Sequence, residues 1–195
     1  MFSSDMPFHD RTMRVMPRTA LILFAIGRDR PGIVDRITGL IFQSGCNLED
    51  SRMAILGGEF ALIVLLTGRP EDLRKVTEEL PVLAKGLELS VQFKETVAGP
   101  EARKGLEPSM RYRIRAVAMD HPGIVHKVAH VLSEHGVNVA RLDTSLSLAP
   151  VTGAPVFSLE IEAEVPAEVT VKALRGQLLH LAEAENIDLE IKAED

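Results

Sequence analysis

Residues 29–34 read Asp-Arg-Pro-Gly-Ile-Val, and residues 45–47 read Gly-Cys-Asn. The same pattern returns further along the chain, as Asp-His-Pro-Gly-Ile-Val at residues 120–125 and Gly-Val-Asn at residues 136–138. The offset is a constant 91 residues, from position 31 to 122 for the proline and from 47 to 138 for the asparagine. Because a fixed offset over separate motifs is typical of an internal repeat, the chain is predicted to be two copies of one module.

Around each copy the sequence predicts the same order of elements, β-α-β-β-α-β. An apolar run at residues 19–26 predicts a strand, and apolar residues at helical spacing after Pro31 predict a helix that ends at Gly45. With right-handed crossovers, this order gives a four-stranded antiparallel sheet covered by two helices on one face, the ferredoxin-like α+β fold. The expected organisation is an N-terminal tail without a signal peptide at residues 1–17, a first module at 18–96, a linker at 97–109 and a second module at 110–195.

The other expected elements follow from turn residues and from hydrophobic spacing. Pro70 opens a second helix in the first module, and Pro81 is expected to disturb its end. The remaining expected strands are 48–56, 60–66, 87–93, 112–119, 138–148, 156–165 and 187–192, and the remaining helices are 124–135 and one within 167–185.

The composition is typical of a globular protein and argues against direct nucleic-acid binding. Of 195 residues, 46% are hydrophobic and 26% are charged, and the formal net charge is −6. Nucleic-acid-binding proteins usually present a basic face and stacking aromatics, whereas this sequence has no tryptophan and one tyrosine. Cys46 is the single cysteine, so an intramolecular disulfide is excluded and a reducing, cytoplasmic location is expected. No apolar run reaches the ~20 residues that cross a bilayer, so no membrane partner is expected.

The two predicted sheets differ on the face that points away from the helices. In the second module, arginines at 111, 113 and 115 and glutamates at 160, 162 and 164 alternate with apolar residues on two strands expected to be neighbours. Such cross-strand pairs give a solvated face, and each contributes only ~0.2–1 kcal/mol. The corresponding strands of the first module are apolar on both faces, around Ile22, Phe24, Ile63 and Leu65. We therefore expect the outer face or the edge of the first sheet to be covered by another domain or chain, and the chain to form a homodimer.

The repeated turn is the expected ligand site, because a helix N-terminus offers unpaired backbone N–H groups and a partial positive charge. Gly32 and Gly123 have no side chain that would hold a ligand away from this backbone. Asn47 and Asn138 are expected to start the strand beside the turn, where an amide can meet both a carboxylate and an ammonium group. The aspartate that opens each copy adds a negative charge for the ammonium group. Together these groups suit a free amino acid.

A purely structural interpretation of the same residues is the alternative. Aspartate is a favoured helix N-cap, and proline is favoured at the first helical position. Gly-x-Asn is also an ordinary helix-to-strand turn. On this interpretation the turns are empty, and the chain is a structural pairing module.

With the duplicated Asp-x-Pro-Gly turns and Gly-x-Asn segments, the sequence resembles the ACT family of small-molecule regulatory modules over both of its halves. The resemblance implies that an amino acid binds at an interface between paired modules, near the first turn and the start of the second strand. Chains of two such modules are most similar to the group of glycine cleavage system transcriptional repressors, which implies action through a protein partner. The candidate ligand-binding residues are Asp29, Arg30, Pro31, Gly32, Ile33, Asn47, Asp120, His121, Pro122, Gly123, Ile124 and Asn138.

Other clusters of reactive residues are interpreted as structural. His126, His130 and Glu134 share one face of an expected helix, and two histidines four residues apart can chelate a metal. The first module does not repeat this pattern, so a solvated helix face is preferred and no metal site is assigned. Cys46 is interpreted as a packed, inert thiol. The sequence contains no recognised catalytic or nucleotide-binding motif, so no catalytic residue and no cofactor are assigned.

These observations lead to the hypothesis of a non-catalytic regulatory protein that senses a small amino acid and acts through a protein partner, as a regulator of transcription in amino-acid (glycine) metabolism. The first alternative is a separate regulatory subunit of an amino-acid biosynthetic enzyme. The second is an enzyme whose site has no recognisable motif.

Overall fold

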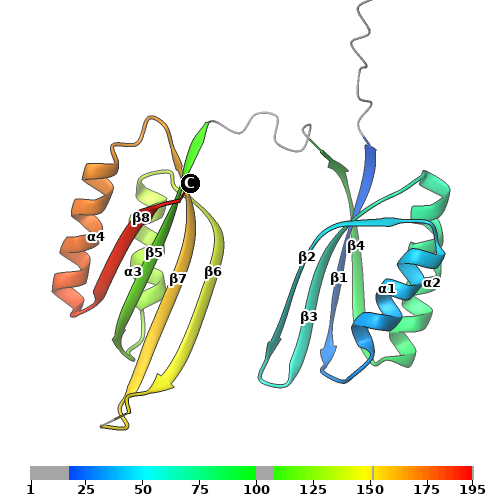
Figure 1. Ribbon diagram of the computed structural model, residues 1–195, viewed down its shortest axis with the longest axis horizontal. Helices are drawn as coiled ribbons and strands as arrows, with labels where there is room; N and C mark the ends of the chain where they lie inside the picture. Colours follow the sequence, from blue (N-terminus) through cyan, green and yellow to red (C-terminus); the bar gives the residue numbers. More distant parts are fainter. Residues whose placement is uncertain (1–17, 100–107, 151, 195) are drawn as a thin grey trace, which may run out of the picture. The chain divides into compact units, whose positions relative to one another are not determined.

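The computed structural model describes residues 18–99, 108–150 and 152–194. The chain divides into two compact units, Met1–Lys104 and Gly105–Asp195, and each has its own hydrophobic core (Figure 1). Among the described residues, no helix is both long enough and apolar enough to span a bilayer.

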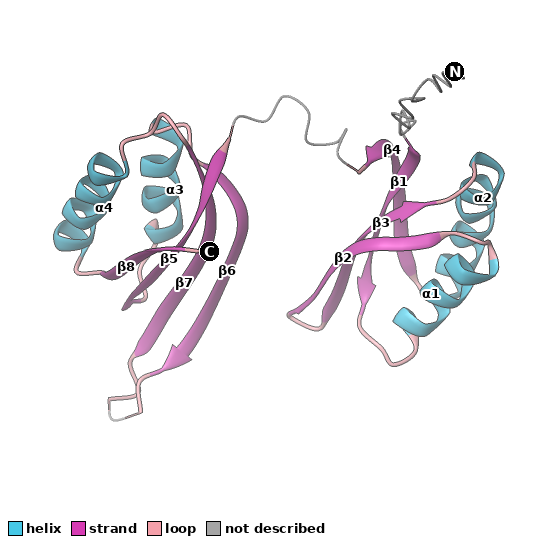
Figure 2. Cartoon of the chain, turned by 45° about the horizontal axis from the view of Figure 1, so that its top comes forward, coloured by secondary structure: helices cyan, strands magenta, loops and turns pink. Residues whose placement is uncertain are grey.

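The first unit is a four-stranded antiparallel sheet, in the order β2-β3-β1-β4, with both helices on one face (Figure 2). The predicted β-α-β-β-α-β arrangement is confirmed. Its elements are β1 (Arg18–Arg28), α1 (Ile33–Gln43), β2 (Asn47–Leu56), β3 (Glu59–Thr67), α2 (Pro70–Gly86) and β4 (Leu89–Ala98).

The second unit repeats this topology, with strand order β6-β7-β5-β8 and both helices again on one face of the sheet. Its elements are β5 (Ser109–Met119), α3 (Ile124–Glu134), β6 (Asn138–Leu148), β7 (Pro155–Pro166), α4 (Val171–Glu185) and β8 (Asp188–Ala193). The repeat deduced from two short motifs therefore extends to every element of the fold.

The core of each unit lies between the sheet and its helices, as the hydrophobic spacing predicts. In α1 the residues at every fourth position, Ile33, Ile37 and Ile41, are buried. They pack with the helix-facing residues of β1, of which Leu23 is fully buried. Val34 follows Ile33 in the same helix and is 44% exposed, so the face of α1 that contacts the sheet does not extend to it.

The prediction that Pro81 disturbs the end of α2 is wrong. The helix continues through Pro81 to Gly86, and β4 begins only at Leu89. A proline inside a helix removes one backbone hydrogen bond, but Leu80 and Ala84 on either side of it are buried against the sheet. Their packing keeps the last turns of the helix in place.

The outer face of the second sheet carries the predicted ladder of opposite charges. Arg113 lies directly across from Glu162, and Arg115 from Glu160. Arg115 Nε is 3.1 Å from Glu160 Oε2, and Arg113 Nε is 3.3 Å from Glu160 Oε1. Arg113 also pairs with Glu194. The register expectation is confirmed, and one glutamate is shared between two arginines.

Candidate functional site

Both repeated turns hold a glycine in the left-handed region immediately before a helix. Gly32 has φ 91° and precedes α1, and Gly123 has φ 100° and precedes α3. Only glycine adopts this backbone conformation without strain. The N-cap residue of both helices is glycine, so Asp29 and Asp120 do not have the N-cap role that the structural interpretation gives them. The first N–H groups of each helix thus donate no hydrogen bond to an N-cap side chain.

Space is open beside the first glycine. A Cβ atom built on Gly32 would meet no atom of the described residues within 4 Å, whereas one built on Gly123 would meet Cε of Lys127 at 3.8 Å. The backbone N–H of Asp29 donates to the carbonyl of Gly58 at 2.9 Å, and the equivalent bond in the second module measures 3.1 Å. Each turn is therefore fixed to the neighbouring hairpin, and the first turn leaves its glycine accessible.

The residue that follows the aspartate gives the two turns different charges. In the first turn, Nε and Nη2 of Arg30 are enclosed and lack a hydrogen-bond partner within the described part of the chain. Enclosed donors without partners are destabilising, and a carboxylate is the group that matches the fork of a guanidinium. In the second turn this position is His121, whose Nδ1 lies 3.3 Å from the carbonyl oxygen of Pro122. The first turn therefore carries a guanidinium group at the position where the second carries an imidazole.

The second turn borders a hollow of about 450 Å³ that is largely apolar. The nearby Lys127 does not leave a free charge there, because its Nζ pairs with Oε2 of Glu185 at 2.6 Å. The hydrogen bond from Lys127 lowers the pKa of the Glu185 carboxyl. The residues that line the hollow are His121, Gly123, Ile124, Val125, His126 and Phe157.

A single module does not bring its asparagine next to its turn. Asn47 lies across from Thr67 on β3, whereas Arg28, the last residue before the turn, lies across from Glu59. These positions are eight residue pairs apart along β3, or about 26 Å at the spacing of a strand. Asn138 is displaced from its own turn in the same way. The expectation that the asparagine starts the strand beside the turn is wrong within one module, because β2 begins at the opposite end of the sheet.

Each asparagine side chain contacts a carboxylate of its own module. Asn47 Nδ2 donates to Glu49 Oε1 at 3.2 Å, and Asn138 Nδ2 donates to Glu164 Oε2 at 3.0 Å. Glu49 also accepts a hydrogen bond from the Thr67 hydroxyl at 2.7 Å. The asparagines are exposed, so they are oriented by a neighbour and still accessible.

Asparagine also begins an exposed edge strand in each module. All ten residues of β2 are exposed, and almost all of β6 is as well. Both strands depart from regular pairing at the same point of the repeat, at Glu49 and at Ala140. Edge strands present unpaired backbone groups and are natural places for a second sheet to add.

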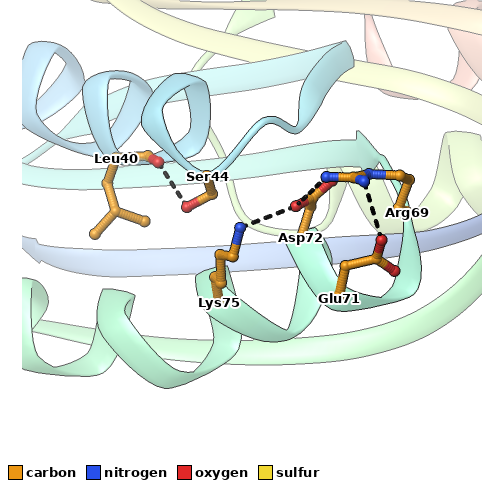
Figure 3. A network of polar contacts seen from close by, with 6 residues as sticks. All are labelled: Leu40, Ser44, Arg69, Glu71, Asp72 and Lys75. Atoms are coloured by element: carbon orange, nitrogen blue, oxygen red, sulfur yellow. Dashed lines mark hydrogen bonds and ion pairs between the residues drawn. The ribbon is translucent and has the colours of Figure 1, made fainter.

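An ion-pair network around the buried carboxylate of Asp72, near the start of α2, was not anticipated from the sequence (Figure 3). The Asp72 side chain is 3% exposed. Its carboxylate accepts hydrogen bonds from Arg69 Nε at 2.7 Å, from Arg69 Nη2 at 3.1 Å and from Lys75 Nζ at 3.1 Å. The bonds from Arg69 and then from Lys75 lower the pKa of Asp72. The spacing of three residues between these charges was the available signal for the network.

Cys46 lies beside this network and is not activated by it. Burial, followed by the charge of Asp72, raises the pKa of the Cys46 thiol. A raised pKa reduces the thiolate fraction on which reactivity depends. The interpretation of Cys46 as a packed, inert thiol remains a prediction.

The histidine cluster of α3 has a simple local arrangement. The rings of His126 and His130 stack with centroids 6.0 Å apart, and His130 Nε2 lies 3.6 Å from Glu134 Oε1. Within the described ranges, no group of three or more histidine, cysteine, aspartate or glutamate residues is arranged to bind a metal ion.

Comparison with known proteins agrees with this architecture. Residues 19–94 and 112–178 each match the ACT domain family. The chain is 33% identical over 147 residues to the glycine cleavage system transcriptional repressor of Escherichia coli strain K12, in an alignment that covers 75% of each protein, and the same values hold for the repressor of Shigella flexneri.

Solved structures of similar proteins cover both modules. An unknown protein from Galdieria sulphuraria superimposes with a TM-score of 0.75 at 26% identity, over 91% of this chain and 99% of that one. A structure assigned to a glycine cleavage system transcriptional repressor has a TM-score of 0.65 at 25% identity, over 91% and 98% of the two chains. The resemblance inferred from the repeated turns is thereby confirmed. The chain belongs to the ACT-domain family and carries two of these domains in tandem.

Proposed function

We propose that this protein is a non-catalytic regulator that senses a small amino acid and passes the signal to a protein partner. Its similarity over 75% of its length to the glycine cleavage system transcriptional repressor of Escherichia coli supports a role in the transcriptional control of glycine metabolism. The net charge of −6 supports a protein partner rather than direct contact with DNA. The observation that carries the proposal is the open, glycine-lined helix start in the first turn, which follows two residues after Arg30 and its unpaired donors.

The amino acid would bind through both of its charged ends. Its carboxylate would accept hydrogen bonds from the first N–H groups of the helix and, in the first turn, from Arg30. Its ammonium group would meet Asp29 and an asparagine amide oxygen. Gly32 leaves room for the ligand to approach the backbone. A small side chain such as that of glycine or alanine fits best, because the ligand lies directly against the backbone.

The asparagine in each site would come from a different module than the turn. If the edge strands of two modules pair in an antiparallel manner, the first residue of each strand lies beside the last residue of the other strand. Because the turn lies at the end of the sheet where β2 finishes, the first residue of the added strand would arrive next to it. A complete site would then exist only in the paired state.

This arrangement couples ligand binding to pairing. A ligand shifts an equilibrium only by its difference in affinity for the two states. A site that is complete in the paired state and divided in the unpaired state has such a difference. The paired state would therefore be the form that the partner recognises when the amino acid is present.

A thermal-shift screen of the twenty amino acids against the whole chain tests the proposal. A ligand that binds only the folded state raises the melting temperature by mass action, and we expect small amino acids, glycine first, to do so. Asn47→Ala and Asn138→Ala should each reduce the shift, whereas Gln177→Ala, at an exposed position of α4, should not. The absence of a shift with any amino acid, or a shift that both asparagine variants retain in full, would contradict the sensor function.

A reporter driven by the promoter of the glycine cleavage genes tests the regulatory role. Deletion of the gene for this protein should change the response of the reporter to glycine, and the purified protein alone should not retard the promoter DNA. Co-purification with a catalytic subunit and an unchanged reporter would instead favour the regulatory-subunit alternative. Turnover of a metabolite by the isolated chain would contradict the non-catalytic assignment.

A further inference from the structure

The sheet of the first module has an apolar patch on the face opposite its helices. On β1 and β3, alternate residues point into the core, and the residues between them form this outer patch. Phe24 is 40% exposed, Ile26 is 56% exposed and Ile63 is 38% exposed. The outer patch comprises Ile22, Phe24, Ile26, Ala61, Ile63 and Leu65.

The fold itself does not require this patch. In the second module the equivalent positions of Phe24 and Ile63 hold Arg115 and Glu160, which form an ion pair at 3.1 Å. Both modules have the same strand order and the same helix-facing core. The apolar outer patch is therefore a separate property of the first module, and contiguous exposed apolar surface of this kind marks an interaction site.

The polar residues that flank the patch are arranged so that the surface complements itself. One row across the sheet reads Asp50, Leu65, Ile22 and Lys94, from β2 to β4. An acid thus lies at one side of the sheet and a base at the other, with two apolar residues between them, and Asp50 Oδ1 also pairs with Arg52 Nη1 of its own strand at 2.6 Å. If a second copy of the sheet is related to this one by a 180° rotation about an axis parallel to the strands, the row is reversed in the second copy. β2 of one copy then faces β4 of the other, and the acid faces the base.

We propose that a second copy of this chain packs its outer patch against this one, sheet on sheet, about such a two-fold axis. Identical subunits related in this way use the same surface on both sides, which must be complementary to itself. In this arrangement Asp50 lies opposite Lys94 of the partner subunit, and the isoleucine, leucine and phenylalanine side chains interdigitate between the sheets. Aligned packing of two sheets at about 10 Å is a standard arrangement.

The size of the surface agrees with a dimer. Four strands spaced about 4.8 Å apart and nine residue pairs of about 3.3 Å each give a face of roughly 600 Å² in projection. Stable interfaces bury ~800 Å² of accessible surface per partner, and accessible area exceeds projected area on a surface of side chains. β2 contributes the Asp50 side chain to this face, whereas its outer backbone edge pairs with no other strand of the described residues, so face packing and edge pairing can occur together.

A graft of the second module's surface onto the first tests the proposal. The double variant Phe24→Arg/Ile63→Glu reproduces a pair that this fold already accommodates, and circular dichroism and thermal melting verify that it folds. Sedimentation velocity over a concentration series should give a dimer for the wild type, and an increase of at least 100-fold in the dissociation constant for the graft. Val117→Lys, on the outer face of the second module, is the matched control and should leave the dimer intact.

A charge reversal at the exposed margin gives an independent test in case the graft fails to fold. Asp50→Lys should weaken the dimer by repulsion from Lys94 of the partner subunit, and Asp50→Lys/Lys94→Asp should restore it. A wild-type chain that remains monomeric at 100 µM would overturn the proposal. So would a dimer that both the graft and the charge reversal leave unchanged. Neither result bears on amino-acid binding at the turns, because no variant alters a turn residue.

Discussion

Asn47 lies at the far end of the first sheet from Asp29, which opens the turn of the same module. Asn138 and Asp120 have the same relationship in the second module. Each module thus carries two halves of a candidate site, one at each end of its sheet. A turn that holds a ligand with the help of an asparagine would therefore take that asparagine from another module. Because the turn and its asparagine can be substituted independently, the turn that each asparagine serves can be measured.

We expect that each asparagine serves one turn only, and that this shows in binding stoichiometry. Arg30→Gln should weaken the site at the first turn, and His121→Ala should weaken the site at the second. If the Asn47→Ala change is combined with the substitution in the turn that Asn47 serves, both changes fall in the same site, and the other site should still bind. If Asn47→Ala is combined with the substitution in the other turn, each site carries one change, and neither site should bind. Isothermal titration calorimetry with the amino acid found in the screen distinguishes these outcomes, and equal losses in both combinations would contradict shared sites.

Substitution of the turn glycines should destabilise the protein, whereas substitution of a nearby helical glycine should not. Gly32 has a positive φ, so Gly32→Ala should lower the free energy of unfolding by about 1–2 kcal/mol. Gly39 lies within α1, where a Cβ would meet no described atom within 4 Å. Gly39→Ala should therefore raise the free energy of unfolding by about 0.5–1 kcal/mol. Urea unfolding curves of the two variants give the comparison, and similar effects at both positions would argue against the left-handed turn.

The sequence was informative about the turns and misleading about where the asparagines lie. Proline and glycine before an apolar stripe are local signals, so the start of α1 at Ile33 followed from the pattern. The distance from Asn47 to the turn depends on the direction of β2 in the sheet, and a residue pattern along one strand does not contain that direction. The duplication identified the modules, but only the paired register of β1, β2 and β3 locates the two ends of the sheet.

Asp72 was missed for a different reason, because its burial depends on its tertiary environment. Its sequence neighbours are charged, and an acidic residue in the first turn of a helix is ordinarily solvated. In the structure, the turn that follows α1 lies against Asp72, so that a Cβ on Gly45 would lie 3.5 Å from the Asp72 carboxyl carbon. The close approach of two helices therefore buries a carboxylate that the sequence alone presents as exposed.

Replacement of Asp72 should make the protein less stable at neutral pH and should matter less in acid. Hydrogen bonds from Arg69 and Lys75 lower the pKa of Asp72 in the folded state. A carboxyl whose folded pKa is lowered contributes stability that is complete above its unfolded pKa, about 3.9, and is lost as the pH falls through the folded pKa. The difference in free energy of unfolding between wild type and Asp72→Asn should accordingly be largest above about pH 5 and shrink below pH 4.

Glu71 provides the matched control for this pH dependence. It contacts the same arginine, with Oε1 3.2 Å from Arg69 Nη1, but its side chain is 50% exposed. Glu71→Gln should have a small effect that added salt removes, because exposed ion pairs are screened. Urea titrations of both variants from pH 3 to pH 7 separate the two cases. An Asp72→Asn effect that is constant over this range would show that the lost stability comes from packing rather than from charge.

The two faces of β7 should differ strongly in their contribution to stability, although their residues alternate along one strand. Glu160 lies on the outer face, is partly exposed and pairs with two arginines. Ile161, the next residue, is fully buried in the core of the second module. Glu160→Gln should cost less than about 1 kcal/mol of unfolding free energy, because the ion pairs are hydrated. Ile161→Ala should cost about 2–5 kcal/mol, since it removes buried methyl groups and leaves a cavity. Chemical denaturation of both variants with and without 1 M salt tests this difference. A large loss of unfolding free energy for Glu160→Gln that salt does not change would mean that the charged face is covered by another molecule. Such a cover is proposed only for the outer patch of the first module.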